Sequence, residues 1–287
     1  MRIGFGLEPI KGLGLDLIVS LLRKILLEHF EFNWRVIPKV DDVLKSLGSA
    51  TTVFHLPIFN RDSFDFSSQT ETYEIQMHEV VSFINQRSKD MNMLFVLAHI
   101  PEDPNASYEL MFERMEQIEV PIVLENVVGY TDEQFLDFYH QAKDSLGKKI
   151  VGHALDISHR YVNDWQTWLD IPEELVKDIA YVHISDCTKT EDLHLPLGLG
   201  EMPFNDFFAF LKEIKYDGVI NQELKPNGNQ ADKIMSSSLH CIKPFSRTKY
   251  FRMKTRCNLL KPLLWFQSRK FKDVKDLTAE EIGYDYV

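Results

Sequence analysis

Short runs of β-branched and aromatic residues alternate along the chain with longer segments in which apolar residues recur every three or four positions. The first pattern is typical of buried strands and the second of amphipathic helices. Eight segments show the strand pattern: residues 2–6, 33–37, 52–55, 94–99, 122–125, 150–154, 180–184 and 219–222. Helical patterns between them include residues 15–27, 72–86, 108–117, 132–144 and 204–214, with helix starts predicted at 131–133 and 205–206. This alternation predicts repeated βαβ units and therefore an α/β fold, a single (β/α)8 TIM barrel.

The barrel is predicted to occupy residues 1–240, because no linker or internal repeat divides that part of the chain. The last helical pattern is expected to end at residues 236–238. Residues 241–287 then form a C-terminal extension that is basic and aromatic-rich at first and acidic at its end. Pro244 and Pro262 interrupt the basic part, so one long amphipathic helix is not expected there.

Composition is compatible with one large barrel, since 44% of the 287 residues are hydrophobic and can supply its core. No apolar stretch of about 18 residues occurs, and basic residues interrupt the apolar run at 15–27. That run therefore favours a helix of the fold over a membrane span or a signal peptide. The three cysteines, Cys187, Cys241 and Cys257, show neither disulfide nor zinc spacing, which predicts a cytoplasmic protein.

Charge is distributed unevenly along the chain. The net charge is −11, yet residues 240–275 have a balance of +10, which leaves −21 on the remainder. An acidic barrel would repel a polyanion, so a nucleic-acid partner is less favoured than a small molecule. Within residues 243–275 cations are interleaved with aromatic residues, which suits an anionic membrane surface and a peripheral membrane location. Binding of this segment to RNA or DNA, to the acidic barrel itself or to a partner subunit is also compatible with its charge.

Imidazoles and carboxylates recur at or just after the predicted strand ends, or just before a predicted helix. The nine positions are His55, His99, Glu125, Asp156, His159, His183, Asp192, His194 and Glu223. Side chains at the C-terminal ends of barrel strands converge on one face, so these groups are expected to meet. Mixed imidazole and carboxylate ligands suit Zn, Mn, Fe or Co, and bound cations would offset the repulsion among the carboxylates. A single strand-end histidine is more often structural, as we expect for His153, so the metal prediction depends on the whole set.

Several short strings occur in a fixed order within residues 1–226. They are His55-Leu-Pro, His99-Ile-Pro, Glu125-Asn, Asp156-Ile-Ser-His159, His183-Ile-Ser-Asp186, Asp192-Leu-His194-Leu-Pro-Leu-Gly198-Leu-Gly200, and Tyr216-Asp-Gly218 before Gln222-Glu223. In this order they resemble the xylose isomerase-like TIM barrel superfamily. That superfamily includes endonuclease IV (AP endonuclease family 2) and the sugar phosphate isomerases and epimerases.

The resemblance implies between one and three divalent metal ions per chain. For a three-ion centre of the endonuclease IV type, the implied ligands are His55, His99 and Glu125 for the first ion, Glu125, Asp156, His183 and Glu223 for the second, and His159, Asp192 and His194 for the third. For a one-ion isomerase, the second set alone is implied. Asn126 and Asp186 would orient ligands from a second shell, and Gly198 and Gly200 would allow a close approach of the backbone.

Two reactions follow from the resemblance. In an isomerase or epimerase, one ion would stabilise an enediolate of a sugar or sugar phosphate, with Glu125 and Glu223 as catalytic base and acid. Arg160, Lys189 or Lys225 could then bind the substrate phosphate. In a multinuclear hydrolase, the ions would together promote attack of water on a phosphoester.

The isomerase or epimerase reaction is our first expectation, because residues 183–223 look most like that branch. The five ligands beyond the one-ion set favour the hydrolase instead. Duplex DNA is disfavoured as its substrate, because the loops after the first two predicted strands lack Arg and Gln in number. A barrel that only binds a ligand and catalyses nothing is a third and weaker alternative.

Overall fold

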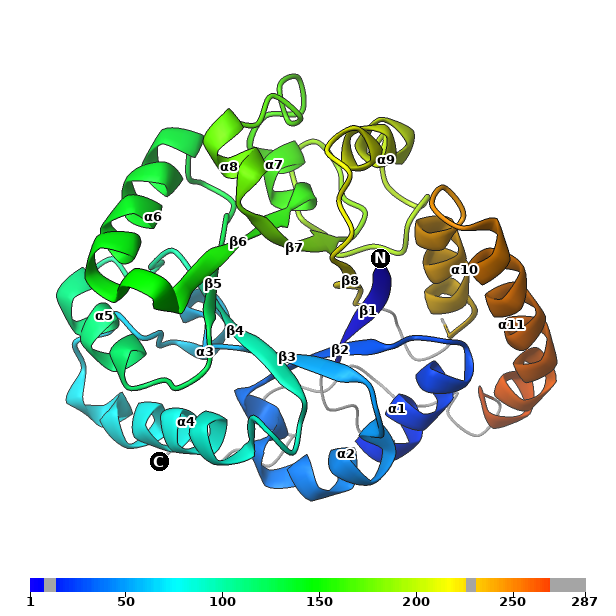
Figure 1. The fold of residues 1–287 in the computed structure, drawn as a ribbon, viewed down its shortest axis with the longest axis horizontal. Coiled ribbons are helices and arrows are strands. Elements are labelled where there is room, and N and C mark those ends of the chain that lie inside the picture. The colour runs from blue at the N-terminus through cyan, green and yellow to red at the C-terminus, as the bar shows by residue number, and fades with distance from the viewer. Residues whose placement is uncertain (8–13, 226–230, 269–287) are drawn as a thin grey trace.

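Eight parallel strands form a closed barrel in the order β1-β2-β3-β4-β5-β6-β7-β8 (Figure 1). The computed structural model describes residues 1–7, 14–225 and 231–268, and gives only the backbone of residues 231 and 263–268. The strands are β1 (Arg2–Leu7), β2 (His29–Asn33), β3 (Thr51–His55), β4 (Met93–His99), β5 (Ile122–Glu125), β6 (Ile150–Asp156), β7 (Ile179–Ile184) and β8 (Val219–Gln222). The pairing of β1 with β8 closes the barrel, which confirms the predicted (β/α)8 fold.

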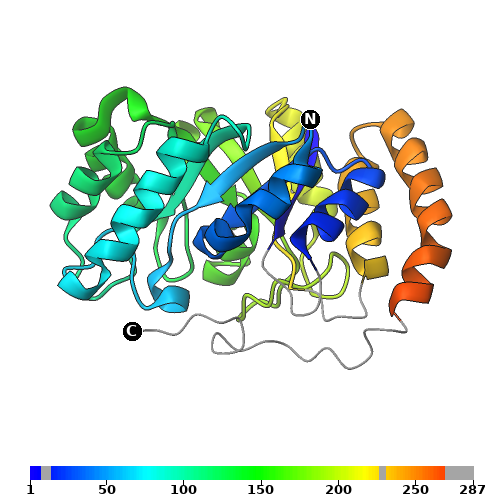
Figure 2. The ribbon, with the colours of Figure 1, turned by 90° about the horizontal axis from the view of Figure 1, so that it is seen from below.

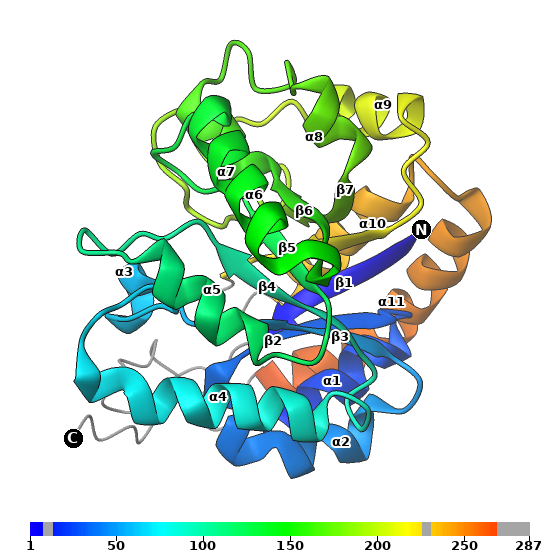
Figure 3. The ribbon, with the colours of Figure 1, turned by 60° about the vertical axis from the view of Figure 1, so that its left-hand side comes forward.

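Helices surround the barrel wall, as Figure 3 shows for α4, α5 and α6 outside β3–β5. The helices are α1 (Leu15–Lys24), α2 (Val40–Leu47), α3 (Phe59–Asp62), α4 (Glu74–Arg87), α5 (Tyr108–Glu116), α6 (Asp132–Leu146), α7 (Ile157–Asn163), α8 (Glu173–Lys177), α9 (Phe204–Glu213), α10 (Ala231–Ile242) and α11 (Arg247–Ser268). Short 3-10 helices occupy Trp34–Lys39, Glu71–Tyr73 and Gly147–Lys149. None of these described helices combines the length and the apolar character that crossing a membrane requires.

The second strand differs from the prediction. Strand β2 spans His29–Asn33, whereas the predicted segment 33–37 lies mostly in the 3-10 helix Trp34–Lys39. The side chain of Asn33 accepts a hydrogen bond from the backbone N–H of Arg35 and so caps this 3-10 helix. The apolar residues that predicted a strand here are instead part of a 3-10 helix, in which Trp34 and Val36 are buried.

The C-terminal helices also differ from the prediction. Helix α10 continues through the serines at 236–238 to Ile242, because Ser237 and Ser238 are buried and hydrogen-bonded rather than exposed at a helix end. The expected break at Pro244 lies between α10 and α11, whereas α11 continues through Pro262, where a second break was expected. A proline inside a helix removes a single backbone hydrogen bond, a local cost that need not end the helix.

The barrel interior has an apolar layer beneath a polar one. Inward-facing residues of the lower layer form a small separate cluster: Val53, Phe95, Leu97, Val123, Ala154, Tyr181 and Val219. Since side chains alternate across a strand, the residues two positions further on point into the same interior. On β3, β4 and β5 these are His55, His99 and Glu125. The polar set therefore lies on a dry apolar floor, which keeps water from reaching it from below.

Helix α6 begins with a capping box, as the predicted helix start at 131–133 requires. The Thr131 hydroxyl accepts from the N–H of Gln134, and the Gln134 side chain accepts from the N–H of Thr131. We expect Thr131→Ala to lower the free energy of unfolding by about 1 kcal/mol, because the helix N-terminus loses an acceptor. Urea unfolding should show this loss for Thr131→Ala and not for the hydroxyl-retaining Thr131→Ser; equal midpoints for both variants would contradict it.

Candidate metal centre

The strand ends bring six of the nine predicted ligands to the C-terminal mouth of the barrel, and helix α7 and the loop after β7 supply the other three. His55, His99, Glu125 and Asp156 end strands β3, β4, β5 and β6, His183 lies in β7, and Glu223 follows β8; His159 lies on α7, and Asp192 and His194 on the loop after β7. Two sets have ligand atoms that all lie within 4.8 Å of one another. They are His55, His99 and Glu125, and Glu125, Asp156, His183 and Glu223.

Glu125 is the common member of the two sets and is fully buried. Its Oε2 lies 3.4 Å from Nε2 of His55 and 3.5 Å from Nε2 of His99. Its Oε1 accepts a hydrogen bond of 2.8 Å from Nδ1 of His183. Within the described residues, Oε2 has no hydrogen-bond partner. A buried, unsatisfied carboxylate oxygen facing two imidazole nitrogens fits a metal ion between them.

Three imidazoles are oriented so that Nε2 faces a carboxylate of the cluster. Nδ1 of His55 donates to the carbonyl oxygen of Leu56 at 2.8 Å, and Nδ1 of His159 to that of Asn126 at 2.8 Å. Nδ1 of His194 donates to the carbonyl oxygen of Glu223 at 3.1 Å. A carbonyl oxygen can only accept, so Nδ1 carries a proton in each ring, and Nε2 is the nitrogen that could bind a metal once any proton on it is displaced. This is how metal-binding histidines are normally oriented.

Asp192 brings together the third predicted set. Its Oδ2 lies 3.3 Å from Nε2 of His159 and 3.1 Å from Nε2 of His194. Its Oδ1 is buried without a hydrogen-bond partner among the described residues. His194 has a positive φ of 47°, which is uncommon for a residue other than glycine and turns its ring toward Asp192. Asp192 thus joins the two imidazoles, but among the described residues these three side chains do not form a set whose ligand atoms all lie within 4.8 Å of one another.

Asp186 organises the loop that carries Asp192 and His194. Its carboxylate accepts hydrogen bonds from the backbone N–H groups of Gly198, Gly200 and Met202. A Cβ atom on Gly200 would lie 2.4 Å from Oδ1 of Asp186, so only glycine allows this approach. Asp186 therefore acts on the ligands through the loop, not by contact with their side chains.

Asn126 fixes Asp156 in place. The Asn126 side chain donates to the Asp156 carbonyl at 2.9 Å and accepts from its N–H at 2.9 Å. Oδ1 of Asp156 also caps helix α7 by accepting from the N–H of His159. Oδ2 lies 3.8 Å from Nδ1 of His183, which leaves it as the atom facing the second set.

Glu31 is part of the centre and was missed by sequence reasoning. Its Oε2 accepts a hydrogen bond of 2.7 Å from Nε2 of His183 and one of 3.3 Å from the Asn221 side chain. Nδ1 of His183 thus faces Glu125, so this histidine is oriented oppositely to the other three. The signal was the alternation within residues 29–33, where a single acid stands between two phenylalanines, Phe30 and Phe32.

Glu102 was also missed. Its carboxylate lies 3.7 Å from Nδ1 of His99, on the far side of the ring from Glu125, and accepts from the Asn60 side chain at 3.0 Å. Neither Nδ1 of His99 nor Oε2 of Glu102 has a hydrogen-bond partner among the described residues, so Glu102 faces the ring without fixing it as Glu31 fixes that of His183. His153, expected to be structural, donates from Nε2 to the Leu175 carbonyl at 2.7 Å and is buried outside the cluster.

Opposed electrostatic effects set the protonation of the centre. Burial would raise the pKa of Glu125, but the charge and the hydrogen bond of His183, together with the nearby imidazoles of His55 and His99, hold the pKa well below its usual range. Burial would lower the pKa of His99, but Glu102 and Glu125 raise it to about 9. Burial raises the pKa of Asp156 to about 6, against the opposing charge of nearby imidazoles. Protonated imidazoles thus balance the carboxylates, and divalent ions would do so by displacing those protons.

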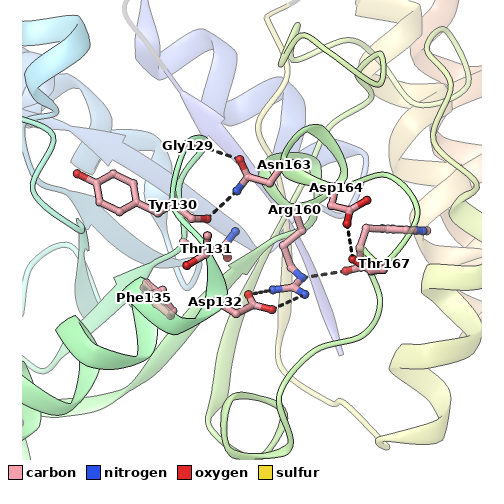
Figure 4. A pocket seen from close by; sticks show the side chains of 11 residues that line it. Gly129, Tyr130, Thr131, Asp132, Phe135, Arg160, Asn163, Asp164 and Thr167 are labelled. Atoms are coloured by element: carbon pink, nitrogen blue, oxygen red, sulfur yellow. Dashed lines mark hydrogen bonds and ion pairs between the residues drawn. The ribbon is translucent and has the colours of Figure 1, made fainter.

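The three residues predicted to bind phosphate have different surroundings. Lys189 packs its ammonium 3.9 Å from the ring centre of Trp165, and Lys225 is exposed just after Glu223. Arg160 lines a cavity of about 490 Å³ between the β5 and β6 loops (Figure 4). There its guanidinium pairs with Asp132 and donates to the carbonyl oxygens of Trp168 and Asp170. A phosphate at Arg160 would have to displace Asp132, so the contacts there are structural.

Comparison with protein families gives one match that covers most of the chain. Residues 13–244 match the family described as xylose isomerase-like TIM barrel. Among curated proteins, the chain is 31% identical over 134 residues to the uncharacterized protein MJ1311 of Methanocaldococcus jannaschii, which covers 44% of this chain and 43% of that protein. The chain thus aligns with less than half the length of the curated relatives it matches.

Solved structures of similar fold include enzymes of two kinds. An AP endonuclease, family 2, from Brucella melitensis is similar with a TM-score of 0.62 and 15% identity, over 85% of this chain and 98% of that chain. A D-tagatose 3-epimerase-like protein is similar with a TM-score of 0.59 and 20% identity, over 85% and 98%. At these identities the likeness concerns the fold alone.

Proposed function

The chain belongs to the xylose isomerase-like TIM barrel family, and we propose that it is a divalent-metal-dependent hydrolase of phosphoesters. The proposal places up to three ions on the nine clustered side chains. The observation that carries it is Asp192, whose carboxylate faces the Nε2 atoms of both His159 and His194. This third set has no part in a one-ion isomerase.

The cost of building the additional ligands supports this choice. His55, His159 and Asp192 are buried or nearly so, and burying polar groups without a function destabilises a fold. The two histidines have their Nδ1 atoms bonded to backbone carbonyls, which orients Nε2 toward the centre. A protein that needed one ion would gain nothing from orienting them.

In this proposal the chain contributes position and charge. Bound ions would stabilise the developing charge on a phosphoester and lower the pKa of a water molecule. Glu125 belongs to both of the first two sets, Glu31 holds the ring of His183 by a hydrogen bond, and Glu102 adds a negative charge 3.7 Å from Nδ1 of His99. The dry layer beneath the centre strengthens all these electrostatic interactions.

A small phosphoester fits the chain better than duplex DNA. The barrel carries most of the negative charge of the protein and would repel a long polyanion. After β2 the chain turns directly into a short 3-10 helix, and Arg35 within it is paired with Asp62 at 2.7 Å. The loop after the first strand, whose composition also disfavours DNA binding, lies at residues 8–13, outside the described residues.

Sugar isomerisation or epimerisation is the second candidate. Glu125, Asp156, His183 and Glu223 form a complete one-ion set by themselves. Nδ1 of His183 lies 2.8 Å from Glu125 and 3.5 Å from Glu223, so two carboxylates flank the place where such an ion would lie. They could act as base and acid on a sugar or sugar phosphate.

Metal content and activity measured on one preparation separate the two candidates. We expect two to three ions per chain after loading with Zn or Mn, and hydrolysis of small phosphomonoesters or phosphodiesters such as bis-p-nitrophenyl phosphate. A single ion per chain, together with ketose epimerisation and no phosphoester hydrolysis, would favour the second candidate and refute the first.

Asp192→Asn tests the third position alone. The amide keeps the shape of the side chain but loses the charge between His159 and His194, so we expect one ion fewer per chain and a loss of hydrolysis of about a hundredfold. The exposed residue Asp206 provides a matched control, since Asp206→Asn makes the same chemical change far from the centre. Unchanged metal content in Asp192→Asn would contradict a third ion.

A further inference from the structure

Helix α11 lies beyond the residues that match the family model. The family match ends at residue 244, and α11 begins at Arg247. The helix lies outside α10 at the edge of the molecule, beside the barrel wall (Figures 1 and 2). Met253 and Cys257 are buried and attach it to the rest of the fold. Tyr250 and Leu260 pack on the core as well, so the face of the helix that points away from these four residues is the one exposed to solvent.

The face of α11 opposite Met253 and Cys257 has an apolar ridge. At about 3.6 residues per turn, Phe251 and Leu259 lie on that outward face, about two turns apart. Phe251 is 61% exposed and Leu259 is 74% exposed. The exposed Thr255 lies between them on the same ridge. Two large apolar side chains are thus presented to solvent on one line.

Cations flank this ridge on both sides. By helical spacing, Lys249, Arg252 and Arg256 lie along one flank, and Arg247, Lys254 and Lys261 along the other; all six are exposed. Residues 243–262 include no acidic residue. Across the ranges that the structure describes, none of the six cations is ion-paired with a carboxylate. Two of them donate to backbone carbonyls, Lys249 to Met1 and Arg256 to Lys24.

We propose that this face of α11 binds the surface of an anionic phospholipid bilayer. Apolar side chains between two rows of cations match the boundary between acyl chains and headgroups, where the ridge enters and the cations meet lipid phosphates. A nucleic acid would pair with the cations but leave Leu259 in water. The proposal is independent of the reaction at the metal centre.

The geometry of the attachment keeps the barrel accessible. The ridge points away from the barrel, and α11 lies beside the wall rather than across the mouth (Figure 2). The barrel, with its excess of acid, would be repelled by the same surface that attracts α11. Repulsion and attraction together would fix one orientation on the bilayer, with the helix toward the lipid.

Vesicle sedimentation of the full-length protein tests the proposal. We expect binding to phosphatidylcholine vesicles that contain phosphatidylserine, and little binding to phosphatidylcholine alone. Each cation near an anionic surface strengthens binding about fivefold, so Arg252→Gln/Lys254→Gln/Arg256→Gln should weaken it by on the order of a hundredfold. The matched control Lys89→Gln/Lys148→Gln/Lys177→Gln removes the same charge from exposed sites elsewhere and should weaken binding far less.

The ridge variant Phe251→Ser/Leu259→Ser distinguishes a bilayer from other anionic partners. It should weaken vesicle binding more than about tenfold while circular dichroism and metal content stay unchanged. Equal sedimentation of wild type and both α11 variants would overturn the proposal. So would tighter binding of an oligonucleotide that the ridge variant leaves intact, or a dimer in solution that the ridge variant dissociates.

Discussion

Glu125→Gln is expected to lower turnover by more than about a hundredfold, whichever of the two reactions the protein catalyses. A lost second-shell partner already costs about 10- to 100-fold in metal affinity or activity, and Glu125 belongs directly to both preformed ligand sets. The amide would also place an N–H₂ group against imidazole nitrogens that must stay free for metal. We therefore expect both positions to lose affinity together.

The fold should survive this change, because glutamine fills the same volume in the buried centre. The measurement is metal content together with the thermal shift that added Mn or Zn produces. A ligand at about 100 times its Kd stabilises a protein by about 2.7 kcal/mol, and this gain should vanish in the variant. Glu174→Gln, on the surface beside His140, provides the control. Turnover equal to that of the wild type would show that the reaction takes place elsewhere.

The location of the centre could be predicted from sequence because the geometry of a barrel determines where its strand ends lie. Residues 122–125 and 219–222 were predicted with the bounds that the structure has, since each is an apolar run ended by a polar residue. Once the strands are known, their C-terminal ends must converge. Nine residues scattered from 55 to 223 could thus be expected near one another without any contact being known.

Strand β2 could not be recognised for a physical reason. Its inward positions are His29, Glu31 and Asn33, all buried and polar. A strand with polar residues at its inward positions lacks the apolar pattern from which strands are predicted. These polar side chains nevertheless find hydrogen-bond partners on distant strands, as His29 does in Tyr181. The second strand was therefore predicted in the next apolar run, at residues 33–37, and Glu31 was not recognised as part of the centre.

The orientation of each imidazole ring could not be predicted from the sequence either. Whether Nδ1 or Nε2 faces the metal depends on a hydrogen bond to a residue far along the chain, such as that from His159 to the carbonyl of Asn126. The ion pair between Arg160 and Asp132 could not be predicted either, because it also joins residues far apart in the sequence. The sequence indicates which side chains meet at the mouth of a barrel. Which of them form hydrogen bonds or ion pairs with one another depends on side-chain packing, which the sequence alone does not show.

Glu31→Gln is expected to weaken metal binding at the second position by about 10- to 100-fold without unfolding the protein. The carboxylate of Glu31 can only accept, so it keeps one proton of His183 on Nε2, and the proton that Nδ1 donates to Glu125 is the one that a metal would displace. A glutamine can turn its N–H₂ toward Nε2 instead. The proton would then lie on Nδ1, where it blocks the ligand position between Glu125 and Glu223.

Two measurements separate this positioning role from a structural one. Metal affinity measured by chelator competition should fall in Glu31→Gln, while Glu213→Gln, on the exposed surface of α9, should leave it unchanged. In metal-free protein, the ¹⁵N shifts of the His183 ring should change from the Nε2–H form, or from the doubly protonated form, toward Nδ1–H. A purely structural Glu31 would lower the midpoint of urea unfolding but leave both the ring shifts and the affinity of the folded protein as they are. That pattern would contradict the role argued here, because charge and acceptor geometry at His183, not packing, are what the variant changes.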